Sequence, residues 1–223
     1  ILLTLVIGIP LMLAEFGIGR RAQLAPVGAL RKLAGRAWVP AGYMFVLAGL
    51  LILSYYAVIA GWTVRYGIEA AFIGFPGSSA DHFAVVASGA DAVAYHLGFM
   101  AITVLIVVGG VKGGIERASL LLMPALFVIV AGLAAWAATL DGAGAGYLKY
   151  LKPELAELMN PAVWRAAASQ AFFSLSLGMG GMLTYASYLK RDQNLPESAT
   201  VVAFTDFGVA FVAGLLVFPV IFS

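Results

Sequence analysis

Residues 170–181 read Gln-Ala-Phe-Phe-Ser-Leu-Ser-Leu-Gly-Met-Gly-Gly and interrupt a long apolar run that extends from about 162 to 189. Serines followed by glycines weaken a helix and free its backbone groups, which inside a membrane are tolerated only where protein buries them or where they line a polar cavity. A helix broken near 174–178 would present N–H groups at one half-helix end and carbonyls at the other, and these ends suit a carboxylate and a small cation respectively. The alternative is a stripe of small residues that packs closely against another helix. The residues of this stretch leave both interpretations open.

The composition of the whole chain is that of a membrane protein. Of its 223 residues, 62% are hydrophobic and 11% are charged, whereas soluble proteins carry roughly 25% charged residues. The net charge is only +2 and no basic run with interleaved aromatic residues occurs, so nucleic-acid binding is excluded. Cysteine is absent and only two histidines occur, which excludes disulfides and thiol catalysis and argues against a histidine-built metal or catalytic centre.

Six apolar stretches have about the length that a membrane-spanning helix needs, roughly 20 residues. They lie at about 1–19, 40–73, 92–110, 118–140, 162–189 and 197–222. Transmembrane β-barrels instead show alternating segments of about ten residues, and these runs are longer and more uniformly apolar. We therefore predict an all-α membrane protein, a polytopic helical bundle. Because the chain begins and ends inside apolar runs, we expect it to be a fragment of a longer protein.

The charges in the breaks between the runs predict the orientation. Residues 20–39 hold five basic side chains and no acidic one, so the positive-inside rule places them in the cytoplasm. Residues 74–91 hold two aspartates and no basic side chain, which places them outside. Lys112 with Arg117, and later Lys190 with Arg191, return the chain to the cytoplasm. The first run therefore crosses from outside to inside.

Two carboxylates lie inside apolar runs, where an ionisable group costs several kcal/mol unless it is paired or hydrated. Glu15 lies near the inner end of the first run, and Asp206 lies in the last one. Glu15 either accepts hydrogen bonds from a neighbouring helix or takes part in a proton or ion relay. Asp206 either binds a sodium ion, with the Ser174 hydroxyl as a second hard oxygen ligand, or bonds to a neighbouring backbone near the start of its helix.

A candidate gate lies at the cytoplasmic start of the fourth run, between Gly114 and Pro124. Proline cannot donate its backbone hydrogen bond, and glycine lowers helix stability by about 1 kcal/mol relative to alanine. We expect the segment between them to unwind and to admit water to a buried sodium ion. The alternative is a proline cap near the start of a helix.

These residues together resemble the neurotransmitter:sodium symporter family, and in particular its bacterial, LeuT-like amino-acid transporters. The resemblance covers nearly the whole chain, as the second to seventh of the family's helices. It rests on Ile7-Gly8-Ile9-Pro10-Leu11-Met12 with Glu15, Ser54–Thr63, Gly114–Arg117 leading to Met123-Pro124, Ala168–Tyr188, and Asn194-Leu195-Pro196 with Asp206. It implies a LeuT-type five-plus-five inverted-repeat fold, of which residues 1–223 are a partial transporter domain. It also implies a multi-pass location in a bacterial inner (plasma) membrane.

The resemblance implies roles for individual residues. The residues that would bind the substrate are Ile52, Tyr56, Phe173, Ser174, Ser176 and Met179. Among them, Tyr56 would bond the substrate carboxylate and Phe173 would cap the substrate from the outer side. The residues that would act in gating or in support of the structure are Glu15, Gly114, Pro124 and Gln170.

The resemblance also implies the coupling ion. Ser174 and Asp206 would bind sodium. Many relatives carry asparagine where this chain has Asp206, so its carboxylate would supply the negative charge that animal relatives take from chloride. We therefore expect that chloride is not required.

The function that the resemblance implies is sodium-coupled symport of a neutral hydrophobic amino acid by alternating access. We expect no enzyme activity, because no histidine lies near a serine motif inside an apolar run and Asp206 has no second aspartate beside it. A proton-coupled amino-acid carrier, with Glu15 or Asp206 titrating, stays open, and so does the more remote alternative of a channel-like or intramembrane enzyme subunit. The expected partners are the amino acid and the lipid bilayer; the sequence leaves open whether the protein is a monomer or a homodimer.

Overall fold

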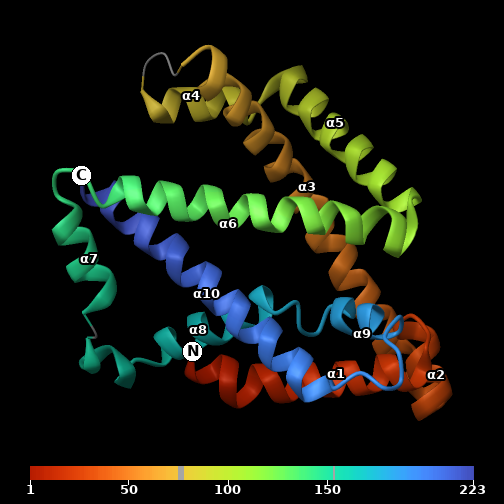
Figure 1. Ribbon diagram of the computed structural model, residues 1–223. Coiled ribbons are helices and arrows are strands. Elements are labelled where there is room, and N and C mark those ends of the chain that lie inside the picture. The colour runs from red at the N-terminus through yellow and green to blue at the C-terminus, as the bar shows by residue number, and fades with distance from the viewer. Residues whose placement is uncertain (75–77, 153) are drawn as a thin grey trace. The chain divides into compact units, whose positions relative to one another are not determined.

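The computed structural model describes residues 1–74, 78–152 and 154–223, and these ranges form helices joined by turns, with no strand among them (Figure 1). The chain divides into two compact units. The first unit comprises Ile1–Gly49 and Ala125–Ser223, and the second comprises Leu50–Pro124. The prediction of an all-α protein is confirmed.

The helices follow the apolar runs of the sequence and add several short elements between them. In chain order they are a π-helical turn Thr4–Gly8, α1 Ile9–Ala22, α2 Pro26–Ala34, a 3-10 turn Arg36–Trp38, α3 Val39–Phe72, α4 Ser79–Val86, α5 Gly89–Val108, a π-helical turn Val111–Glu116, α6 Arg117–Ala137, α7 Ala143–Leu151, a 3-10 turn Leu155–Met159, α8 Pro161–Ser174, α9 Gly181–Ala186 and α10 Leu195–Phe222.

Among the residues that the structure describes, four helical segments are long and apolar enough to cross a membrane. They are Arg36–Phe72, Gly89–Val108, Val111–Ala137 and Leu195–Phe222. The predicted runs at about 1–19 and 162–189 are also helical: the first continues through a π-helical turn into α1, and a non-helical segment divides the second. That these two runs also cross the membrane stays a prediction.

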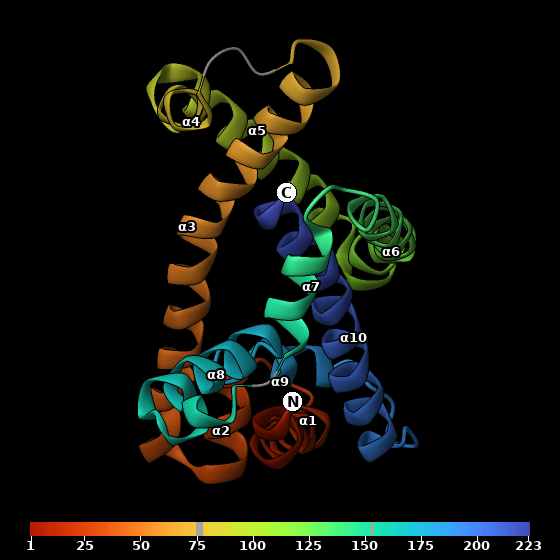
Figure 2. The same ribbon diagram turned by 90° about the vertical axis from the view of Figure 1, so that its left-hand side faces the viewer.

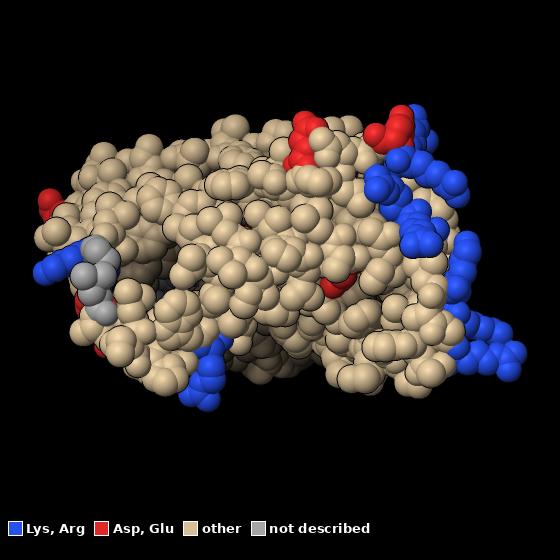
Figure 3. Space-filling view, turned by 90° about the horizontal axis from the view of Figure 1, so that it is seen from below, with Lys and Arg blue, Asp and Glu red and all other residues tan. Residues whose placement is uncertain are grey.

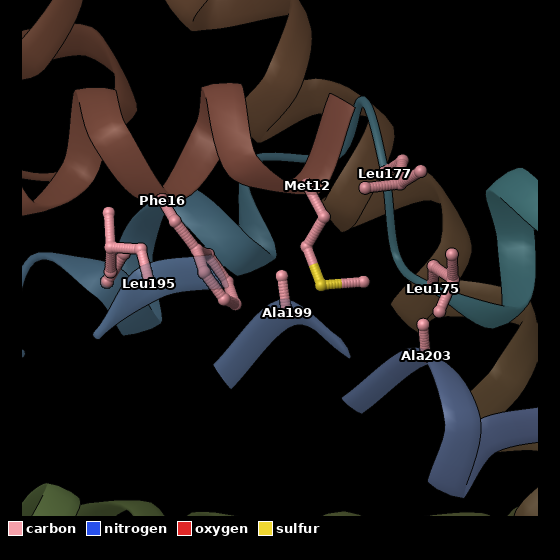
Figure 4. Close-up of a cluster of buried hydrophobic side chains, with 8 residues drawn as sticks. Met12, Phe16, Leu175, Leu177, Leu195, Ala199 and Ala203 are labelled. Atoms are coloured by element: carbon pink, nitrogen blue, oxygen red, sulfur yellow. The ribbon is translucent and has the colours of Figure 1, made fainter. Parts of the chain in front are cut away.

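The core of the first unit lies where α1 packs against α9 and α10 (Figure 4). Its buried side chains are Met12, Phe16, Leu175, Leu177, Ala186, Leu195, Ala199 and Ala203. Met12 and Phe16 stand four residues apart on α1 and therefore share one face of the helix. Leu175 and Leu177 come from the segment between α8 and α9, so apolar burial anchors this segment to α1 and α10.

The contact between α1 and α9 depends on a glycine. A methyl group added at Gly19 would collide with the backbone carbonyl of Leu183 and would lie 2.9 Å from the side chain of Ala186. A residue without a side chain at this position therefore lets the two backbones approach closely.

The break after residue 140 contains structure that the sequence did not predict. None of the six predicted runs covers Ala143–Leu151, yet these residues form α7, which packs along α10 (Figure 2). The ring of Tyr150 stacks on Phe218 with centroids 4.8 Å apart, and Gly146 lies so close to Phe218 that a methyl group there would meet its backbone. The aromatic contacts of α7 with α10 stabilise a helix that is too short and too rich in glycine to be stable alone.

In the second unit, charged side chains join the end of α3 to α4. Arg65 Nε lies 2.8 Å from Glu69 Oε1, and Glu69 Oε2 lies 2.8 Å from His82 Nε2 on α4. Arg65 also donates to the carbonyl of Val85 at 3.2 Å and is only 8% exposed. The buried arginine is therefore compensated both by a carboxylate and by a backbone acceptor.

Candidate functional site

The most unusual backbone of the first unit lies between α8 and α9. α8 ends at Ser174 and α9 begins at Gly181, and the residues between them form turns. Ser176, Gly178 and Gly180 have φ values of 53°, 75° and 71°. This left-handed region is open to glycine at little cost but is uncommon for serine. The predicted break near 174–178 is confirmed, and the glycines of the sequence explain it.

Glu15, on α1, accepts a hydrogen bond from the segment between α8 and α9. The backbone N–H of Gly178 donates to Glu15 Oε1 at 2.7 Å. Glu15 is only 6% exposed, and its second oxygen, Oε2, has no hydrogen-bond partner among the described residues. Of the two interpretations of Glu15 made from sequence, the geometry agrees with a buried carboxyl that accepts a hydrogen bond. The donor is a freed backbone group of the break rather than a side chain of an intact helix.

Asp206 meets the other side of the break. The Ser174 hydroxyl donates to Asp206 Oδ1 at 2.6 Å, a length typical of a hydrogen bond to a charged oxygen. Both residues are half-buried, and Asp206 lies well inside α10 rather than at its start. The structure therefore brings together the two residues that we predicted to bind sodium.

The chemistry of this pair fits a small hard cation. A carboxylate and a hydroxyl are both oxygen ligands, which hard cations prefer. Within the described residues, no group of three or more His, Asp or Glu side chains could hold a metal ion. Any cation at Ser174 and Asp206 therefore needs further ligands of another kind, such as backbone carbonyls.

The predicted substrate-binding residues fall into two sets. Ser174, at the end of α8, is preceded by the exposed Phe173 and followed within the break by Ser176 and Met179, all in the first unit. Ile52 and Tyr56 lie four residues apart on α3, in the second unit.

The two sets have different local geometry. In the first unit, Ser176, Gly178 and Gly180 have positive φ values, so the break does not keep the regular side-chain spacing of a helix. In the second unit, the four-residue spacing places both side chains on one face of α3.

The remaining predicted residues occupy helical positions. Gln170 lies on α8, four residues before Ser174 and on the same face. Gly114 lies in the π-helical turn Val111–Glu116, where a methyl group would collide with the carbonyl of Ile106. Pro124 lies inside α6 and not at a helix start, so the alternative of a proline cap is wrong. The segment between Gly114 and Pro124 is helical in this structure, and its opening as a gate stays a prediction.

Sequence reasoning missed several residues that organise the site. Gly178 was noted as a helix breaker but not as the partner of Glu15, and Leu175 and Leu177 were not identified as buried anchors. The leucines of Ser174-Leu-Ser-Leu-Gly178 were an available signal, because large apolar side chains are often buried even where the backbone is not helical.

Comparison with known proteins places these features in a family. The model of the Sodium:neurotransmitter symporter family matches residues 83–222. The uncharacterized sodium-dependent transporter YhdH of Bacillus subtilis is 39% identical over 229 residues, which cover 100% of this chain and 51% of that protein. Human SLC6A17, named a sodium-dependent neutral amino acid transporter, is 28% identical over 257 residues, which cover 99% of this chain and 35% of that protein.

A solved structure agrees with these relatives. The crystal structure of MhsT in complex with L-phenylalanine matches with a TM-score of 0.89 and 43% sequence identity, over 99% of this chain and 51% of that one. This chain spans about half the length of YhdH and of MhsT. The relatives are transporters and not enzymes, and the resemblance drawn from the sequence is confirmed. The chain is thus part of a multi-pass integral membrane protein with a LeuT-type fold, and it belongs to the sodium:neurotransmitter symporter family.

Proposed function

We propose that the protein containing this chain couples the entry of sodium to the uptake of neutral hydrophobic amino acids by alternating access. The observation that carries this proposal is the broken helix between α8 and α9, with Ser174 bonded to Asp206 on one side and Gly178 bonded to Glu15 on the other. A helix interrupted among apolar segments frees backbone groups for a substrate and an ion. No covalent step is required, because binding and conformational exchange suffice.

Asp206 and Ser174 would be ligands of the coupling ion. Their oxygens lie within 2.6 Å of each other, so one cation can contact both after a small adjustment of the serine rotamer. The carboxylate also brings a full negative charge to the site, and we propose that it makes chloride unnecessary. The names of the sodium-dependent relatives agree with sodium as the coupling ion.

The substrate class is inferred from the residues to which the resemblance gives a role in substrate binding. Ile52, Tyr56, Phe173 and Met179 carry no formal charge. A substrate with a charged side chain would leave that charge without a partner in an apolar site, at a cost of several kcal/mol. The flexible, polarizable side chain of Met179 suits substrates of varied shape. The phenylalanine bound to MhsT and the neutral amino acids in the name of SLC6A17 support the same class.

The test is uptake by the full-length protein in liposomes. Radiolabelled phenylalanine or leucine should accumulate when sodium is outside, and replacing sodium with choline at fixed pH should reduce uptake to background. Glutamate and lysine in excess should leave the uptake nearly unchanged, whereas unlabelled leucine or tryptophan should compete. Competition by lysine equal to that of leucine would contradict the substrate class.

A proton-coupled carrier is the second candidate, because Glu15 is a buried carboxyl in contact with the break. The same assay separates the two. Uptake that persists without sodium and follows an imposed pH gradient would favour protons over sodium.

A further inference from the structure

A hollow in the first unit is lined by basic side chains from three segments. Arg20 and Arg21 come from the last turn of α1, Lys32 from the last turn of α2, and Arg191 from the turn after α9. Gly17 and Leu33 complete the lining of this hollow, which has a volume of about 660 Å³. Figure 3 shows Lys and Arg side chains gathered along one edge of the face it draws. The positive-inside rule places residues 20–39 and Arg191 at the cytoplasmic surface.

Hydrogen bonds fasten the three segments around the hollow. Arg20 Nη1 donates to the carbonyl of Gln193 at 2.6 Å, which ties the end of α1 to the turn before α10. Gln23 Nε2 donates to the carbonyl of Leu189 at 3.1 Å. Lys32 Nζ donates to the carbonyl of Ala22 at 3.0 Å, which ties α2 back to α1. The segments that carry the basic side chains are therefore joined to one another by hydrogen bonds.

Within the described residues, no acidic side chain pairs with the basic side chains of the hollow. No acidic side chain lines it, and none of its four basic residues forms an ion pair within the described ranges of the chain. Like charges that share a concave site repel one another and concentrate anions. Arg31 and Arg36 also contribute to the positive charge that orients the chain in the membrane, but they do not line the hollow. Orientation alone therefore does not explain why the four basic side chains of the hollow lie together.

We propose that this hollow binds the phosphate-bearing headgroup of an anionic phospholipid from the cytoplasmic leaflet. Guanidinium groups match phosphate oxygens in geometry and charge, and basic pockets between helices near the cytoplasmic surface suit anionic headgroups. The volume exceeds what one phosphate ion needs, and Gly17 and Leu33 add apolar surface to the lining of the hollow beside α1. This inference rests on the orientation of the chain and is independent of the transported substrate.

The test compares lipid binding by two double variants of the purified full-length protein. Native mass spectrometry would measure the binding of phosphatidylglycerol and phosphatidylcholine with identical acyl chains. Arg21→Gln with Arg191→Gln removes the charge of two side chains of the hollow that donate no hydrogen bond within the described residues, and Arg31→Gln with Arg36→Gln is the matched control outside it. We expect the first variant to lose about tenfold or more in phosphatidylglycerol affinity, and the control to lose less than about twofold.

Three outcomes would overturn the proposal. The first is equal affinity of the wild type for the two lipids, and the second is an equal loss of phosphatidylglycerol binding in both double variants. The third is that millimolar glycerol 1-phosphate or inorganic phosphate displaces phosphatidylglycerol and phosphatidylcholine equally well. That result would identify a site for free phosphate. Unchanged phosphatidylcholine binding and an unchanged melting temperature in the Arg21→Gln, Arg191→Gln variant would show that it is folded.

Discussion

Removing the carboxylate of Glu15 tests whether α1 sets the conformation of the proposed substrate site. Glu15→Ala deletes the acceptor for the N–H of Gly178, which lies 2.7 Å from Oε1. Glu15→Gln keeps a carbonyl oxygen in nearly the same place but removes the charge. Glu197→Gln changes an exposed carboxylate at the start of α10 and is the control.

The magnitude follows from the kind of hydrogen bond that is lost. Bonds to a charged group contribute about 1.5–3 kcal/mol. Gly178 is exposed, so water can replace the lost acceptor, and we expect a value near the lower end of that range. About 1.5 kcal/mol corresponds to roughly a tenfold weaker affinity for the substrate. Glutamine retains a neutral bond of about half that strength, which corresponds to a loss of about threefold.

The assay is equilibrium binding of labelled phenylalanine to the full-length protein at saturating sodium. The expected order of affinity is wild type and Glu197→Gln first, then Glu15→Gln, then Glu15→Ala. A folded Glu15→Ala protein that binds within about twofold of the wild type would refute the reasoning, because the freed N–H would then not need its carboxylate. The melting temperature, measured without substrate, separates a loss of the site from a loss of the fold.

Three other substitutions test the ion site, the proposed gate and the packing of α1. Asp206→Ala should abolish sodium-dependent substrate binding, measured by sodium titration, and an unaltered sodium affinity would show that Asp206 is not a ligand. Removing chloride from the wild type should leave uptake unchanged. Pro124→Ala restores a backbone donor inside α6 and should slow turnover in an exchange assay without weakening substrate binding; equal turnover would exclude a gate at this position. Gly19→Ala should lower the melting temperature, because its methyl group meets the Leu183 carbonyl, whereas Gly17→Ala, which meets no atom within 4 Å, should not.

The parts of the fold that were predicted from the sequence are those with a strong local signal. The long apolar runs became α3, α5, α6 and α10, and the serines and glycines of 174–181 became a break. Long apolar helices can be predicted from the length and hydropathy of the segment alone, without knowledge of the elements they pack against. The short helices α2, α4 and α7 were not predicted, since helices of this length depend on tertiary contacts such as the stacking of Tyr150 on Phe218.

The candidate site was predicted in its residues but only partly in its contacts. Polar groups inside apolar runs singled out Glu15, Ser174 and Asp206, because each needs compensation. The pairing of Ser174 with Asp206 was predicted from their shared suitability as oxygen ligands. The pairing of Glu15 with Gly178 joins residues 163 positions apart. Spacing along the chain carries no information about such a contact. Because every residue except proline has a backbone N–H, the residue type does not indicate which N–H will bind a carboxylate.

The broken segment and the two carboxylates compensate one another. A continuous helix through residues 174–181 would satisfy its own backbone, and Glu15 would then lack the N–H of Gly178 as a donor. An apolar residue at position 15 would in turn leave that N–H without its acceptor. Asp206 accepts a hydrogen bond from the hydroxyl of Ser174, the last residue of α8. Any movement of the break therefore changes the contacts of α1 and of α10 together. If the protein alternates between two states as proposed, this linkage would give the substrate and the ion a common structural element through which each alters the affinity for the other.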